Sequence, residues 1–228
     1  MGAMIFSQLE SVSKRDRVVA LLKEAILSGK INSGDPIVES QVARQLGVGQ
    51  ALIREALIEL EHQGFVQRQP YRGTRVTTLS RGDIEQIFRL RSELEPLAAQ
   101  WAQENATRDD IEALRRLVEG MRQGAADLDL ETFYEHDLAF HRKLWEMSKN
   151  KYLVEALERI VIPLFAFFVM KTQRIRESYT QSVIMHEKIV DALDTMEAMD
   201  VRRLVQEIMG AFREEWLTKL LPDDESPR

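Results

Sequence analysis

The sequence predicts a mainly α-helical protein, with an N-terminal winged helix-turn-helix and a C-terminal all-α bundle of six helices. One observation is that an early helical pattern gives way to a hairpin-like stretch, whereas from Asp83 onward the periodicity is helical throughout. Another is a change in charge: residues 1–80 hold ten Lys and Arg against eight Asp and Glu (+2), and residues 81–228 hold 21 against 29 (−8). We therefore expect two domains, 1–80 and 81–228, with different partners.

The first predicted helix spans residues 14–28. It carries the i, i+3, i+4 apolar stripe of an amphipathic helix and stops at Gly29. The stripe consists of Val18, Leu21, Leu22, Ala25 and Ile26.

Two further helices follow a turn at INSGDP. The second is expected at about 39–46 and the third at about 50–63, with the turn Gly47-Val48-Gly49 between them. Gly64 is expected to end the third helix in a left-handed conformation. The third helix would be the recognition helix, because the second helix of a helix-turn-helix enters the major groove.

The change of period after Gly64 indicates the wing. The runs FVQRQ and TRVTTL are short and β-type, and they flank Pro70-Tyr71-Arg72-Gly73, a sequence typical of a hairpin. Residues 78–82 are the expected linker to the second domain. Beyond it, periodicity and breaks predict six helices, at about 83–104, 108–125, 130–148, 151–172, 179–196 and 200–220.

Composition excludes several classes of protein. With 44% hydrophobic and 30% charged residues, the chain is typical of a globular protein and not of a disordered one. No apolar run reaches the roughly 20 residues that a membrane helix needs, and no secretory leader is evident. Zero cysteines exclude disulfides and thiolate sites, and they fit a cytoplasmic protein. A net charge of −6 argues against indiscriminate nucleic-acid binding.

Candidate DNA contacts lie on the recognition helix and the wing. Arg54 is one turn into the helix and faces away from its apolar side. Arg72, Gly73 and Arg75, at the hairpin, could follow a phosphate strand or enter a minor groove. The alternative is a winged helix that binds protein, with these arginines as ordinary solvated charges.

The stretch from Leu21 to Val76 resembles the DNA-binding domain of GntR-family regulators, above all in REAL..LE..G at residues 54–64. Two departures are that Ser33 stands where the family has Pro, and that GQAL at residues 49–52 replaces SRTP. The resemblance implies double-stranded DNA as a partner, contacted by Ser40, Gln50, Arg54, Arg72 and Gly73. Because Gln pairs best with adenine and Arg with guanine, we expect an operator that differs from the family's usual one.

The second domain places ionisable side chains on apolar stripes. Asp137 and His141 are i, i+4 neighbours on one inward stripe, His186 lies on another, and Arg91 and Glu95 lie on a third. Each alone could be a core residue satisfied by a hydrogen bond. Together they predict a polar internal cavity, because buried charges are costly unless they are paired or bound to metal.

This residue set suits a divalent metal with open coordination positions. Asp137, His141 and His186 would hold Zn²⁺, Ni²⁺ or Mn²⁺, and Arg91 would bind a ligand carboxylate bidentately. The other two histidines, His62 and His136, are expected to be exposed.

The second domain also resembles a known family. RLRSELEPLAAQWA, HDLAFHRKLWEMSKNKYL and HEKIVDAL are similar to the FCD ligand-binding domain of the FadR branch of GntR regulators. The resemblance implies metal ligands at Asp137, His141 and His186 and a pocket-facing Arg91. The family's fourth histidine is absent, because no histidine follows His186 and residues 208–212 are apolar. A count of six helices favours the VanR-like subgroup.

Three functional hypotheses follow. The preferred one is a ligand-responsive transcription regulator, a repressor, that binds a pseudo-palindromic operator as a homodimer and senses a small carboxylate metabolite. The alternatives are a helical metal-dependent enzyme and a ligand-binding dimer that no longer binds DNA. The enzyme is disfavoured, because no second carboxylate–histidine pair or general base accompanies the three ligands.

Overall fold

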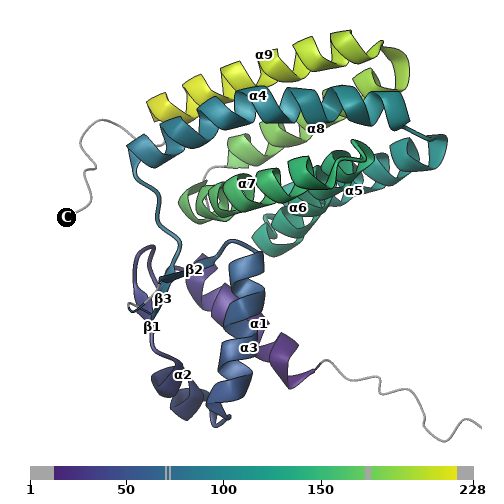
Figure 1. Cartoon of the computed structure of the whole chain (residues 1–228). Coiled ribbons are helices and arrows are strands. Elements are labelled where there is room, and N and C mark those ends of the chain that lie inside the picture. The colour runs from purple at the N-terminus through teal and green to yellow at the C-terminus, as the bar shows by residue number, and fades with distance from the viewer. Residues whose placement is uncertain (1–12, 70, 72, 173–175, 220–228) are drawn as a thin grey trace, which may run out of the picture.

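The computed structural model describes residues 13–69, 71, 73–172 and 176–219. Figure 1 shows a helical bundle (teal to yellow) standing on a smaller N-terminal unit of helices and short strands (purple to blue). The predicted fold class, a winged helix-turn-helix followed by six helices, is confirmed within these residues. No helix among them is long and apolar enough to cross a membrane.

The N-terminal unit contains α1 (Lys14–Leu27), α2 (Glu39–Leu46) and α3 (Gln50–His62), followed by strands β2 (Val66–Gln69) and β3 (Gly73–Val76). A strand that periodicity did not predict, β1 (Pro36–Ile37), joins them in the antiparallel order β1-β3-β2. Two residues are too few to show a period of two, so β1 is defined only by its pairing with β3.

The bundle contains α4 (Arg81–Asn105), α5 (Arg108–Asp127), α6 (Leu130–Met147), α7 (Lys151–Thr172), α8 (Arg176–Thr195) and α9 (Ala198–Lys219). Capping boxes at Ser80–Asp83 and Thr107–Asp110 begin α4 and α5, and Asp129 caps α6. The expected linker at 78–82 is therefore too long, since α4 already begins at Arg81. Figure 1 shows α4 lying along α9.

Gly64 follows the end of α3 and packs closely against α7 of the bundle. Its φ is +76°, and a Cβ atom built there would lie 2.6 Å from the backbone oxygen of Ile162 on α7. Both the left-handed backbone and the close approach to α7 therefore require glycine at this position.

We expect Gly64→Ala to lower the free energy of unfolding by about 2–4 kcal/mol, because it adds a backbone clash to the cost of a positive φ. Urea unfolding of the full chain measures this. Gly47→Ala is the matched control, because Gly47 has φ +65° but nothing within 4 Å of its Cβ position. Equal losses for both variants would contradict the role of the α7 contact.

Candidate metal centre and nucleic-acid interface

Three potential metal ligands meet in the core of the bundle. Asp137 and His141 lie one turn apart on α6, and His186 comes from α8. One ligand atom from each residue lies within 4.8 Å of the others, and all three residues are buried. The Nε2 atoms of the two histidines are 3.0 Å apart, and Oδ1 of Asp137 is 3.3 Å from Nε2 of His186.

The hydrogen bonds around His186 orient a lone pair toward this cluster. Its Nδ1 lies 2.7 Å from the backbone oxygen of Ser182, and a carbonyl only accepts, so Nδ1 carries the proton and Nε2 does not. Metal-binding histidines are typically oriented in this way, with the second ring nitrogen donating to a carbonyl or carboxylate.

Burial favours the neutral form of each of the three groups. It raises the pKa of Asp137 to about 7, against the opposing effect of Arg91. It lowers the pKa of His186 to about 4 and that of His141 well below its ordinary value. The imidazoles are therefore unprotonated near neutral pH, which is the state that binds metal.

These residues fit a divalent cation. Two imidazole nitrogens and a carboxylate oxygen converge, and each has a lone pair to offer. A cation bound by these lone pairs would offset the desolvation of all three groups. Two imidazoles and one carboxylate suit Zn²⁺, Ni²⁺ or Mn²⁺ and leave coordination positions open for a ligand.

The side of the site facing α9 is apolar. Ile208, Met209 and Phe212 line the cavity in the region where the resemblance led to the expectation of a fourth histidine. Among the described residues, the cluster therefore has three protein ligands.

Arg91 lies in the same cavity and is only 1% exposed. Its Nε donates to Oε1 of Glu95 at 2.7 Å, whereas its Nη1 is buried without a partner. The guanidinium also lies over the rings of Phe165 and Phe212, with centroid distances of 5.1 and 6.0 Å. An unpartnered guanidinium N–H in a buried cavity can bind a ligand carboxylate. The sequence placed Glu95 on the same stripe but did not identify it as the partner of Arg91.

The cavity has an empty volume of about 510 Å³, part of which is open to solvent. Its polar lining consists of Arg91, Ser182 and the three candidate ligands, and the remaining lining residues are apolar or aromatic.

Helix α2 and the beginning of α3, which carry the candidate DNA contacts Ser40, Gln50 and Arg54, lie at the end of the molecule away from the bundle (Figure 1). Ser40, Gln50, Arg54 and Gly73 are exposed, and Arg72 lies outside the described residues. No side chain caps the start of α3 at Gly49.

Two arginines of this unit have partners that the sequence did not indicate. The Arg54 guanidinium donates from Nη2 to the carboxylate of Glu39 on α2 at 2.9 Å, and this contact raises the pKa of Arg54. Arg75, a candidate DNA contact of the wing, donates to the backbone oxygen of Gly34 at 2.9 Å.

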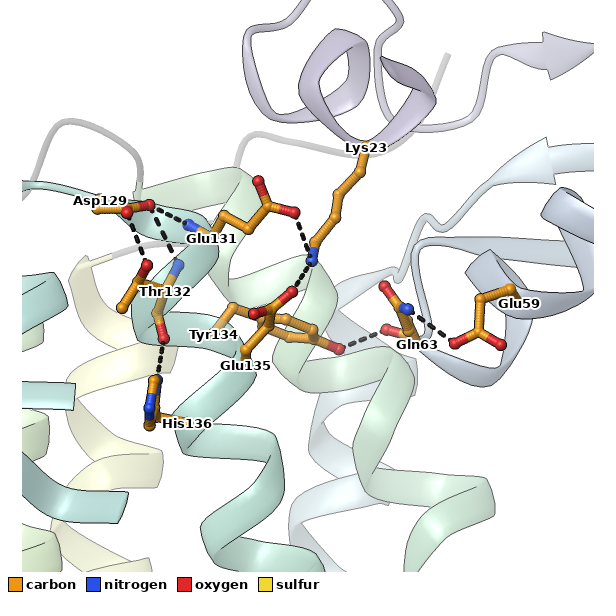
Figure 2. A network of polar contacts seen from close by, with 9 residues as sticks. All are labelled: Lys23, Glu59, Gln63, Asp129, Glu131, Thr132, Tyr134, Glu135 and His136. Carbon is orange, nitrogen blue, oxygen red and sulfur yellow. Dashed lines mark hydrogen bonds and ion pairs between the residues drawn. The ribbon is translucent and has the colours of Figure 1, made fainter. Parts of the chain in front are cut away.

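Helix α6 also contacts the DNA-binding unit directly. Figure 2 shows Lys23 of α1 reaching down between Glu131 and Glu135, with Nζ–Oε1 distances of 3.0 and 2.9 Å. The Lys23 side chain is 2% exposed and lies near the rings of Phe65 and Tyr134. Lys23 was not identified from the sequence, because it lies on an ordinary helix whose acidic partners are more than 100 residues away.

The end of the recognition helix accepts two hydrogen bonds from side chains of α6. The Tyr134 hydroxyl donates to the backbone oxygen of Gln63, as Figure 2 shows, and Nη2 of Arg142 donates to that of His62 at 3.2 Å. Asp137 and His141 belong to the same helix, so α6 carries two of the three candidate metal ligands and also contacts the end of the recognition helix.

The prediction for His136 is wrong. Its ring lies against Gly120 of α5, where an added Cβ would be 2.0 Å from Cδ2 of His136, and the residue is partly buried. Its Nδ1 contacts the Thr132 backbone oxygen at 2.8 Å. The absence of a side chain at Gly120 leaves space for the ring of His136. His62 is exposed, as expected.

A winged helix with an exposed recognition helix, joined to a helical bundle with an internal ligand cavity, defines a regulator that combines DNA binding and sensing in one chain. Residues 14–76 match the bacterial regulatory proteins of the gntR family, and residues 86–211 match the FCD domain. The chain belongs to the GntR family of transcriptional regulators and carries an FCD domain.

Individual relatives agree with this assignment. The chain is 30% identical over 169 residues, 74% of each protein, to a probable D-xylose utilization operon transcriptional repressor of Paenarthrobacter nicotinovorans. It is 25% identical to the gluconate operon transcriptional repressor of Bacillus subtilis, over 92% of this chain and 90% of that one. The structure of Escherichia coli McbR/YncC has the same fold, with a TM-score of 0.67 at 23% identity, covering 90% and 99% of the two chains. These proteins are regulators, so the enzyme hypothesis is not supported.

Proposed function

We propose that this protein is a transcriptional repressor whose affinity for its operator is controlled by a small carboxylate bound with a divalent metal in the bundle. The single observation that carries the proposal is the position of α6, which bears Asp137 and His141 and also contacts the end of the recognition helix. Relatives named as operon repressors support the direction of control. Such a regulator would act in the cytoplasm, where its DNA is accessible.

In the sensor domain, Asp137, His141 and His186 would hold the metal, which would act as a Lewis acid toward the carboxylate of the effector. The second contact comes from the protein, because Nη1 of Arg91 is buried without a partner in the same cavity. Glu95 holds the Arg91 guanidinium in place through its ion pair. Arg91 would thereby select anionic ligands.

In the DNA-binding unit, Arg54, Gln50 and Ser40 would contact the operator, with Arg72 and Gly73 of the wing. Arg54 and Glu39 are paired, so DNA must compete with Glu39 for the guanidinium. The uncapped start of α3 leaves its N-terminal dipole available to a phosphate, although Gly49 supplies no hydroxyl. Two copies of the chain would each take one half of a pseudo-palindromic operator.

Effector binding would then shift α6 and change the angle between the two recognition helices of the dimer. A ligand shifts such an equilibrium only by the difference in its affinity for the two arrangements. We expect this coupling to be about 1–3 kcal/mol, equivalent to roughly 5–150-fold weaker operator binding.

The experiment that tests DNA binding is fluorescence anisotropy with a pool of genomic fragments at several salt concentrations. We expect sequence-selective binding by the wild type, and at least about tenfold weaker binding by Arg54→Ala, because a good base contact contributes about 1–3 kcal/mol. Arg203→Ala is the matched control, since Arg203 is an exposed arginine on α9 that also pairs with an acidic neighbour.

The same experiment tests the second candidate function, a ligand-binding dimer that does not read DNA. The GQAL sequence at residues 49–52 favours that candidate, because it lacks a hydroxyl and an arginine of the family motif. Weak binding that is equal for all fragments and both variants would overturn the repressor and support the ligand-binding dimer.

A further inference from the structure

The lining of the sensor cavity indicates which carboxylates it can accept. We infer that the effector is a monocarboxylate with an apolar body, and that the cavity excludes polyhydroxylated sugar acids and dicarboxylates. This inference rests on the proposed function, because it assumes that the carboxylate lies between the metal cluster and Arg91.

The cavity offers few hydrogen-bonding partners to a ligand. Beyond Arg91 and the candidate ligands, Ser182 supplies the only polar side chain among the described residues that line the cavity, and its hydroxyl is 3.5 Å from Nδ1 of His186. Each ligand hydroxyl buried without a partner costs on the order of tenfold in affinity. A ligand with several hydroxyls beyond the carboxylate end would therefore bind poorly.

The cavity presents an apolar surface to the body of the ligand. The rest of the lining comes from three helices and contains only apolar side chains, with Leu164, Phe165 and Phe168 on α7, Met185 and Ile189 on α8, and Ile208, Met209 and Phe212 on α9. Methionine and aromatic side chains adapt well to aliphatic or aromatic groups. An apolar chain in this cavity would lose no hydrogen bonds and would remove apolar surface from water.

The charges around the cavity favour a ligand with a single carboxylate. Arg91 and Glu95 form a buried ion pair, so their charges cancel, and Asp137 contributes −1 as a metal ligand. With a divalent cation the site carries +1, which a single carboxylate neutralises. A second carboxylate would leave an uncompensated negative charge in a largely apolar cavity, which is strongly unfavourable.

Three six-carbon acids test the effect of additional hydroxyls separately from the effect of a second carboxylate. 2-Hydroxyhexanoate, gluconate and 2-hydroxyadipate share a carboxylate and a 2-hydroxyl, and they differ only in further hydroxyls or in a second carboxylate. Isothermal titration of the full chain loaded with Mn²⁺ gives the affinity of each. We expect 2-hydroxyhexanoate to bind at least about tenfold more tightly than either of the others.

Substitution in the lining tests where the preference arises. Met209→Gln keeps the length of the side chain but adds an amide. We therefore expect it to weaken the binding of 2-hydroxyhexanoate and to reduce the ratio of the affinity for 2-hydroxyhexanoate to the affinity for gluconate. Met196→Gln is the matched control, because Met196 is 44% exposed and lies outside the cavity.

The outcomes distinguish the inference from the proposed function. If gluconate or 2-hydroxyadipate binds as tightly as 2-hydroxyhexanoate, the inference of an apolar monocarboxylate effector is wrong. The proposed function, in which the protein senses a carboxylate, is then still supported. If none of the three acids binds to the metal-loaded protein, both are overturned.

Discussion

His186→Ala is expected to weaken the binding of Zn²⁺, Ni²⁺ or Mn²⁺ by about a hundredfold or more. Apparent free energies of about 10–16 kcal/mol for four-ligand structural zinc sites correspond to roughly 3 kcal/mol per ligand. His186 is the only one of the three ligands on α8, so its loss leaves Asp137 and His141 on a single helix. Two ligands one turn apart cannot hold α6 and α8 together through the metal.

Thermal unfolding with added metal measures this effect without an activity assay. A metal present at 100 times its dissociation constant stabilises the wild type by about 2.7 kcal/mol, and His186→Ala should gain almost none of this. Asp137→Asn, which removes the charge and keeps the shape, should behave in the same way. His62→Ala is the control, because His62 is an exposed histidine on α3 and is not one of the three clustered residues. Equal stabilisation of the wild type and His186→Ala would disprove the three-ligand site.

Lys23→Met is expected to uncouple the sensor from the DNA-binding unit. Methionine keeps an unbranched side chain beside the rings of Phe65 and Tyr134, but it removes the charge that lies between Glu131 and Glu135. These two glutamates are one helical turn apart and would then repel each other. Because both are substantially exposed, we expect a loss of only about 1–2 kcal/mol in stability.

The diagnostic result for Lys23→Met is the ratio of operator affinities with and without metal plus 2-hydroxyhexanoate, measured by anisotropy. We expect this ratio to fall toward one, while the acid itself still binds with close to wild-type affinity. A variant that had merely unfolded would lose both. Lys30→Met is the matched control, because Lys30 is 69% exposed and lies 3.6 Å from Glu24. An unchanged ratio in Lys23→Met would show that α6 transmits its shift by another route.

The features that the sequence predicted are those that depend on local periodicity. The apolar stripes predicted the helices to within a few residues of their observed bounds. The same periodicity identified Asp137, His141 and His186 as inward-facing, because polar residues interrupted otherwise apolar stripes. The strand β1 escaped prediction because it consists of two residues stabilised by pairing with β3.

Other features depend on partners that are distant in sequence. The sequence made Arg75 a candidate DNA contact of the wing, but it did not indicate that this side chain binds the backbone of Gly34, 41 residues away. His136 was expected to be exposed, but Gly120 on the neighbouring helix leaves space for its ring. In each case the side chain is surrounded by residues of another element. The local sequence pattern therefore could not predict these contacts.

The sequence by itself determined the inward-facing stripes that carry the candidate ligands of the bundle, because these stripes follow the 3.6-residue period of each helix. Only the tertiary structure decided which of them meet. The packing of α8 near α6 brings Nε2 of His186 within 3.0 Å of Nε2 of His141, and two acidic residues of α6 surround the ammonium of Lys23. The physical reason is that a buried charge or lone pair is stable only beside a complementary group, and the fold supplies that group from a distant part of the chain.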